Sequence, residues 1–212
     1  RQMCIRDRVR GAFAQYLSPE MVNRLAESSD ALVLGGERKE MTFLFSDIRG
    51  FTKISEQYKD DPEALTQLIN RLLTVLSNSI LDHGGTIDKY MGDCIMAFWN
   101  APTDQLDHRE LAIKAAHAMN KALSQLNEEM KDSLNFKLEI GIGINSGECI
   151  VGNMGSDKRF DYTVLGDAVN LASRLESQSS NYGLSMIIGE NTFLNNSAFQ
   201  IIEIDKIAVK GK

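Results

Sequence analysis

Two aspartates stand where the sequence predicts that a strand ends or turns. Asp47 follows the apolar run Met41–Phe45, and Asp93 follows Gly92 between two short strand-like runs. Where a fold places these strands side by side, both carboxylates can reach one point. Paired carboxylates at sheet ends are suited to hold Mg²⁺ together with a polyphosphate. Spacing alone leaves an alternative open, in which Asp47 caps a helix and Asp93 forms a turn.

A glycine-containing turn follows Asp47 and leads into a predicted helix start. The backbone N–H groups near Gly50, Phe51 and Thr52 are free at such a start, so they can donate hydrogen bonds to phosphate oxygens. The turn therefore favours a phosphate-bearing ligand at the same place as the aspartates.

A second candidate pair lies further along the chain. Asn170 and Arg174 are four residues apart on a helix predicted over 167–180, so they share one face. An amide beside a permanently charged guanidinium suits a phosphorus centre that gains negative charge. The alternative is a solvated arginine with a local hydrogen bond, which is common on helices.

The elements that must position these residues alternate between strands and helices. Apolar runs predict strands over 41–47, 86–91 and 94–99, the last two joined as a hairpin through Gly92-Asp93. Helices are predicted from Asp61-Pro62 to Gly84-Gly85 and, after Pro102, across 111–126. Strict alternation over 136–144 predicts a strand with one face buried. The order is typical of an α+β split βαβ (ferredoxin-like) core, with an antiparallel sheet and helices on one face.

The ends of the chain extend this core. We expect an N-terminal lead-in over 1–40, with a short amphipathic helix over 12–27 and a polar connector over 28–40; residues 1–8 are interpreted as a truncation edge or a non-native scar. The main α+β domain is expected over 41–212 and to be truncated at its C-terminus. Beyond the alternating strand we expect a strand over 148–151 and short strands near 184–188, 199–204 and 207–209.

Composition limits the class of partner. The 212 residues are 43% hydrophobic with a net charge of −6, which excludes general disorder and disfavours nucleic acid or anionic membranes as partners. No apolar stretch approaches the length of a membrane span, so we expect no membrane contact in this fragment. The three cysteines are widely spaced, which predicts reduced thiols and a cytoplasmic setting. We expect the histidines (His83, His108, His117) to be solvated and three methionines (Met91, Met96, Met119) to fill the core.

Four motifs in register resemble the class III nucleotidyl cyclases, the adenylate/guanylate cyclase catalytic domains, in their bacterial form. The motifs are Phe45–Thr52, Lys89–Asp93, Leu165–Arg174 and the ending Val209–Lys212. The upstream segments 15–20 and 34–37 resemble the lead-in of bacterial multidomain members. The resemblance covers nearly the whole chain, from about Phe13 to Lys212.

The resemblance implies roles for individual residues. It implies that Asp47, Asp93 and the Ile48 carbonyl hold two divalent metal ions, Mg²⁺ or Mn²⁺. Asn170 and Arg174 would then stabilise the transition state. In the same way, Lys210 would contact the terminal phosphates, and Lys89 and Thr163 would read the base.

The base-reading pair indicates the substrate. Guanylate cyclases typically carry Glu and Cys where this chain has Lys89 and Thr163. A lysine can donate to adenine N1 and a threonine hydroxyl can accept from its amino group, whereas guanine presents the opposite pattern, so discrimination can be large. Many animal members carry Asp where this chain has Thr163, a departure that bacterial relatives share.

The resemblance thus implies an adenylate cyclase that converts ATP to 3′,5′-cyclic AMP and pyrophosphate by in-line attack of the ribose 3′-hydroxyl. It implies a head-to-tail homodimer whose two sites are shared between subunits, with a sensor domain upstream and membrane anchoring open for the full-length protein. Two alternatives stay open: a guanylate cyclase, and a non-catalytic nucleotide-binding or dimerisation module of a signalling protein. A diguanylate cyclase or polymerase palm shares the two-metal logic, but it lacks a counterpart of the Asn170–Arg174 helix.

Overall fold

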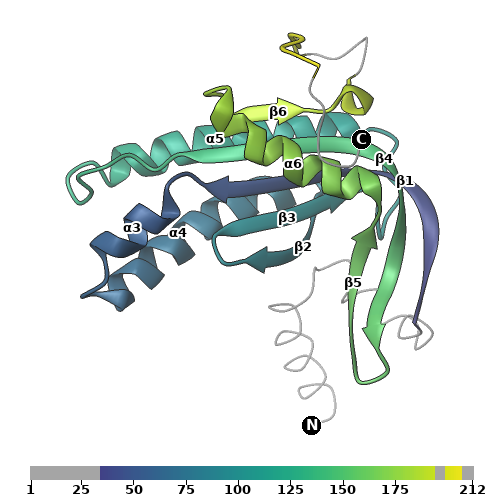
Figure 1. Cartoon of the computed structure of the whole chain (residues 1–212), viewed down its shortest axis with the longest axis horizontal. Helices are drawn as coiled ribbons and strands as arrows, with labels where there is room; N and C mark the ends of the chain where they lie inside the picture. Colours follow the sequence, from purple (N-terminus) through teal and green to yellow (C-terminus); the bar gives the residue numbers. More distant parts are fainter. Residues whose placement is uncertain (1–33, 194–198, 207–212) are drawn as a thin grey trace.

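A computed structural model describes residues 34–193 and 199–206 of the chain (Figure 1). The helix predicted over 12–27, the strand predicted over 207–209, residues 1–8 and Lys210 lie outside the described residues.

A single six-stranded sheet organises the described residues. Its strands are β1 (Gly35–Ile48), β2 (Thr86–Met91), β3 (Cys94–Trp99), β4 (Ile140–Ser156), β5 (Arg159–Leu165) and β6 (Met186–Ile188). The order β2-β3-β1-β4-β5 is antiparallel throughout, and β6 adds to β4 in parallel. The predicted α+β class and split βαβ core are confirmed.

Four helices and a short 3₁₀ turn complete the described fold: α3 (Phe51–Gln57), α4 (Pro62–Leu81), α5 (His108–Glu129), α6 (Asp167–Asn181) and η2 (Glu190–Thr192). The start of α4 follows the sequence signal, because the Asp61 carboxylate accepts a hydrogen bond from the Ala64 N–H at 3.0 Å and Pro62 occupies the first turn. No helix among the described residues is long and apolar enough to cross a bilayer.

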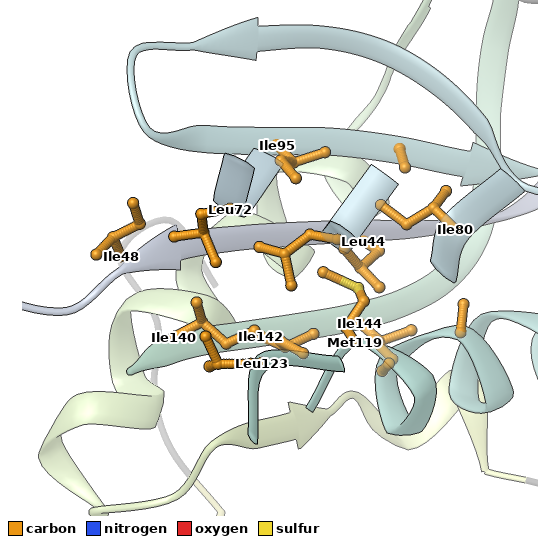
Figure 2. Close-up of a cluster of buried hydrophobic side chains, with 14 of the residues drawn as sticks. Leu44, Ile48, Leu72, Ile80, Ile95, Met119, Leu123, Ile140, Ile142 and Ile144 are labelled. Carbon is orange, nitrogen blue, oxygen red and sulfur yellow. The ribbon is translucent and has the colours of Figure 1, made fainter. Parts of the chain in front are cut away.

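The helices cover both faces of the sheet, not one face as predicted. Helices α4 and α5 pack on one face, where Leu72 and Met119 meet the isoleucines of β4 (Figure 2). Helix α6 packs on the other face (Figure 1). Its residues Val169 and Ala172 belong to the same buried cluster as the phenylalanines of β1 and β3. Because both faces are covered, burial is continuous through 41–46 and 140–146 rather than alternating.

The glycines between those isoleucines explain the misleading pattern in β4. A Cβ placed on Gly143 would lie 2.1 Å from the Glu176 nitrogen and 2.2 Å from the Ala172 oxygen. Gly143 is therefore the position where the backbone of α6 rests directly on the sheet. A small residue that looks like a gap in a hydrophobic pattern is in fact a helix contact.

Strands β1 and β4 form a longer ribbon than the sequence indicated. They pair without interruption from Gly35↔Asn153 to Ile48↔Ile140. Residues 35–40, predicted as a polar connector, are thus strand, and the strands predicted over 136–144 and 148–151 are one strand that begins at Ile140. In the outer part of the ribbon the β1 residues are mostly exposed and polar, although they pair with buried β4 residues such as Cys149 and Val151, so no hydrophobic pattern marks β1 there.

The predictions for the short C-terminal strands and for the methionines are each partly confirmed and partly wrong. The strand near 184–188 is confirmed as β6, whereas described residues 199–206 contain no strand. Met96 and Met119 are buried, but Met91 is 45% exposed.

His108 is buried rather than solvated. Its Nδ1 lies 2.7 Å from the Thr42 hydroxyl, and the Thr42 hydroxyl lies 2.7 Å from the hydroxyl of Ser146.

Candidate functional site

The structure brings the two candidate metal-binding aspartates together. Asp47 lies opposite Gly141 near the end of β1, and its neighbour Ser46 pairs with Ile95 of β3. That pairing places Asp47 beside the β2–β3 turn, which contains Asp93. Asp93 is near enough to Asp47 that it raises the pKa of the Asp47 carboxyl.

The electrostatics of this pair are those of crowded carboxylates. Burial, the hydrogen bond to Asp93 and the negative charges of Asp93 and Glu176 raise the pKa of Asp47 from 3.8 to about 7, against the opposing hydrogen bond from the Ile48 N–H at 3.0 Å. Two neighbouring carboxylates repel each other when both are ionised. A divalent cation removes this repulsion, so such a pair favours cation binding.

Glu176 is an acidic neighbour that sequence reasoning missed. A Cβ on Gly141, opposite Asp47, would lie 2.6 Å from its Oε1. Burial raises the pKa of Glu176, opposed by a hydrogen bond from Ser177 and the charge of Arg49. The charge of Glu176 also raises the pKa of Asp47, so Glu176 adds to the negative potential at the aspartate pair.

Cys94 follows Asp93 and is a neighbour without a nucleophilic role. Burial and the charges of Asp47, Glu176 and Asp93 raise the pKa of its thiol to about 12. Cys94 is therefore protonated at neutral pH and a poor nucleophile. Cys94 and Cys149, the cysteines within the described residues, are both free thiols, as predicted.

Lys89 and Thr163 meet although they lie on different strands at the two ends of the path β2-β3-β1-β4-β5. The Lys89 ammonium donates to the Thr163 hydroxyl oxygen at 3.4 Å across 74 positions of sequence. The sheet therefore curls until its edge strands approach each other.

Asp88 is a second residue that sequence reasoning missed. Its carboxylate accepts the Thr163 hydroxyl proton and lies 3.0 Å from the Lys89 ammonium, and its side chain is 0% exposed. Burial raises the pKa of Asp88, while the hydrogen bonds from Thr163 and Lys89 lower it.

A β-bulge explains how two successive residues reach the same partner. In a regular strand Asp88 and Lys89 would point to opposite faces. Here Ile87 pairs with Ala97 and Lys89 pairs with Met96, so Asp88 is the extra residue. Such a bulge re-aims the following side chain, and both Asp88 and Lys89 come to face β5.

Asn170 and Arg174 lie on the outer side of α6. The buried residues of that helix are Val169, Ala172, Leu175 and Ser179. At 3.6 residues per turn, Asn170 and Arg174 lie on the opposite face, turned away from their own sheet. Neither side chain has a hydrogen bond or ion pair within 34–193 and 199–206. The structure thus does not bring this pair together with Asp47 and Asp93 in one chain.

The turn after β1 has the geometry that a tight helix start requires. Gly50 precedes α3 with φ of 67°, a left-handed conformation that favours glycine. Its carbonyl accepts from the N–H of Lys53 at 2.9 Å, which leaves Phe51 and Thr52 as the first helical residues. The phosphate contacts expected of this turn remain a prediction, as does the role of Lys210, which lies outside the described residues.

Comparison with known proteins identifies the class that this fold and site define. Residues 35–212 match the family described as the adenylate and guanylate cyclase catalytic domain. The chain belongs to this family, and its fold is the class III cyclase fold.

Individual relatives include both kinds of cyclase. The chain is 38% identical over 183 residues to an adenylate cyclase of Anabaena cylindrica, a match that covers 82% of the chain and 35% of that relative. Among solved structures, it is similar to the adenylyl cyclase CyaB from P. aeruginosa, with 44% identity and a TM-score of 0.70 over 75% of this chain and 81% of that one. It is also similar to the guanylyl cyclase Cya2, with 37% identity and a TM-score of 0.71 over 84% of this chain and 89% of that one.

Proposed function

We propose that this chain is the catalytic domain of an adenylate cyclase, which converts ATP to 3′,5′-cyclic AMP and pyrophosphate. The observation that carries the proposal is the contact between Lys89 and Thr163 at 3.4 Å. An ammonium can only donate, so Lys89 suits the acceptor N1 of adenine, and the Thr163 oxygen can accept from the 6-amino group. Guanine would present an N–H to the lysine and a carbonyl to the threonine oxygen, which leaves polar groups unpaired.

The Asp47–Asp93 pair fits the divalent ions that this family is expected to use. The neighbouring negative charge of Asp93 helps to raise the pKa of Asp47 to about 7. A bound cation would offset that negative charge. Two protein carboxylates, with substrate phosphates completing the shell, are a usual Mg²⁺ arrangement. Asp47, Asp93 and the Ile48 carbonyl would hold two such ions, Mg²⁺ or Mn²⁺. Bound there, the ions supply charge neutralisation at the α-phosphate and a lower pKa for the ribose 3′-hydroxyl.

The remaining residues position the nucleotide and stabilise developing charge. Lys89 and Thr163 fix the base, which sets the ribose 3′-oxygen in line with the α-phosphorus. Arg174 and Asn170 donate to the α-phosphate oxygens as negative charge grows on them. The 3′-hydroxyl loses its proton to solvent and its oxygen forms a bond to the α-phosphorus, while the bond from that phosphorus to the leaving pyrophosphate breaks. No protein nucleophile is required, in keeping with the protonated state of Cys94.

The orientation of α6 supports a site shared between two subunits. Because Asn170 and Arg174 face away from the sheet that ends at Asp47, a second chain is needed to bring one chain's arginine to the other chain's aspartates. We propose a head-to-tail homodimer in which one subunit supplies Asp47 and Asp93 and its partner supplies base-reading and transition-state residues. An upstream sensor domain in a longer protein would then act on this pairing.

Product analysis tests the proposal. The chain is incubated with Mg²⁺ or Mn²⁺ and either ATP or GTP, and cyclic nucleotides are separated by chromatography. We expect cyclic AMP from ATP, with a much lower yield of cyclic GMP from GTP. Preferential cyclisation of GTP would establish the guanylate cyclase alternative. A dimer that binds both nucleotides and cyclises neither would establish the non-catalytic module.

A further inference from the structure

We propose that Asp88 is a positioning residue that sets the hydrogen-bond polarity of the Lys89–Thr163 pair and thereby the preference for adenine over guanine. The inference rests on the proposed function and extends it to a residue that does not touch the base itself.

The contacts of Asp88 divide its two carboxylate oxygens between the two base readers. Oδ2 accepts the hydroxyl proton of Thr163, and Oδ1 lies 3.0 Å from the Lys89 ammonium. The Asp88 side chain is 0% exposed, whereas 39% of the Lys89 side chain is exposed, so the carboxylate lies behind the pair and leaves the lysine open to a ligand. Charge-assisted contacts of this kind are roughly twice as strong as neutral ones.

A hydroxyl group has one proton and two lone pairs, so its single donor can serve one partner at a time. The Thr163 proton is directed at Asp88, which means that Thr163 offers only lone pairs to a base. Without that carboxylate the hydroxyl would rotate freely and could accept from an amino group or donate to a carbonyl. Asp88 therefore turns an ambiguous hydroxyl into an acceptor.

The bulge in β2 is what places the carboxylate there. Ile87, opposite Ala97, packs on the α4–α5 face, and Met96, opposite Lys89, packs on the α6 face. The extra residue Asp88 thus shares its face with Lys89 instead of pointing away from it. A regular strand would offer one residue to Thr163, whereas the bulged strand offers an adjacent acid and base.

Substitution Asp88→Asn tests the polarity while nearly preserving shape. The Lys89 ammonium can only donate, so the amide oxygen turns toward Lys89 and the NH₂ group faces Thr163. The Thr163 oxygen must then accept from the amide, which frees its proton for the guanine carbonyl. We expect the ratio of kcat/KM for ATP to kcat/KM for GTP to fall by roughly 10–100-fold.

Two further variants distinguish the effect of hydrogen-bond polarity on substrate preference from a general effect of negative charge or of misfolding. Asp88→Glu retains a carboxylate and should keep more of the ATP preference than Asp88→Asn does. Asp161→Asn removes a nearby exposed charge that influences Asp88 and should leave the ratio unchanged. An unaltered ratio in a folded Asp88→Asn protein, or the same loss in Asp161→Asn, would overturn the inference.

A double substitution tests whether Asp88 acts through Thr163. In a Thr163→Val background the hydroxyl is absent, so adding Asp88→Asn should change the ATP-to-GTP ratio by less than about twofold. A full additional loss in that background would show that Asp88 acts elsewhere, and would overturn the role given to it.

The unaltered chain provides a measurement that does not depend on the folding of any variant. An ATP analogue with hydrogen in place of the 6-amino group keeps N1 but gives Thr163 nothing to accept. Its kcat/KM should be about 10–100-fold below that of ATP, and equal use of both would overturn the inference. Failure of the proposed function is distinguished by the absence of cyclic AMP from ATP itself.

Discussion

The carboxyl group of Asp93 lies near enough to that of Asp47 to raise its pKa, although Asp47 lies at the end of β1 and Asp93 in the turn between β2 and β3. The antiparallel pairing of β1 with β3 creates this contact. Because the raised pKa of Asp47 favours its protonated form, protons and metal ions should compete for this pair of carboxyl groups.

The first prediction is a pH-dependent loss of stability in metal-free protein. The pKa of Asp47 is raised from 3.8 to about 7 in the folded chain, so folding favours its protonated form. The contribution of protonated Asp47 to the free energy of unfolding is fully present below pH 3.8 and is lost as pH rises through about 7. Thermal unfolding in chelator should show Tm falling between pH 5.5 and 8, and millimolar Mn²⁺ should reverse the fall.

Matched substitutions control this measurement. Asp47→Asn should flatten the pH dependence and remove most of the stabilisation by Mn²⁺, whereas Asn at the exposed residue Asp60 should change neither. An Asp47→Asn protein with the wild-type Tm profile would contradict the assignment.

The second prediction concerns Arg174. Because its guanidinium lies on the outer face of α6 and has no ion-pair partner among the described residues, its loss should spare folding and impair chemistry. We expect Arg174→Ala to lower kcat by about 10²–10³ with little change in Tm. The exposed Lys121→Ala on α5 is a control and should retain full activity. Unchanged turnover in Arg174→Ala would exclude the transition-state role.

The third prediction concerns the shared site. Asp47→Ala and Arg174→Ala proteins should each be inactive, because each destroys both sites of its own homodimer. Mixed in equal amounts and allowed to exchange, half of the dimers are mixed and each carries one intact site, which predicts recovery of about a quarter of wild-type activity. Two variants that exchange subunits, as shown by tagged copurification, yet stay inactive would refute the shared site.

The fourth prediction concerns the contact between α6 and β4. A Cβ at Gly143 would lie 2.1 Å from a backbone nitrogen of α6, which cannot move aside as a flexible side chain can. We expect Gly143→Ala to lower the free energy of unfolding by about 1–3 kcal/mol in urea titrations. Ser180→Ala, exposed near the end of the same helix, should change it by less than about 0.5 kcal/mol.

An element of the fold could be predicted where its own residues carry a local pattern. The helices α4 and α5, the β2–β3 hairpin and the position of β6 carry apolar periodicity, a cap or a glycine turn, and all were predictable. The strand over 35–40 was not, because its own residues are mostly exposed and polar and therefore leave no periodic apolar pattern. The burial of His108 likewise depends on Thr42 and Ser146, which come from strands distant in sequence.

The candidate site shows the same division. Asp47 and Asp93 could be paired from the order of strands, since each lies at a strand end. Lys89 and Thr163 came only from family resemblance, because their contact depends on the curl of the whole sheet. Asp88 carried no signal at all, because a bulge depends on the pairing register with β3 and not on residue type.

That bulge separates the ability to fold from the choice of substrate. Deleting one residue at position 88 would leave a hairpin of regular pairing, with Ile87 and Lys89 opposite the same partners they have now. The hydrophobic side of the hairpin would survive, but the carboxylate beside Lys89 and Thr163 would be gone. With the role proposed for Asp88, a single codon in β2 is thus a place where a lineage could change its nucleotide preference while its core, its sheet order and the Asp47–Asp93 pair stay untouched.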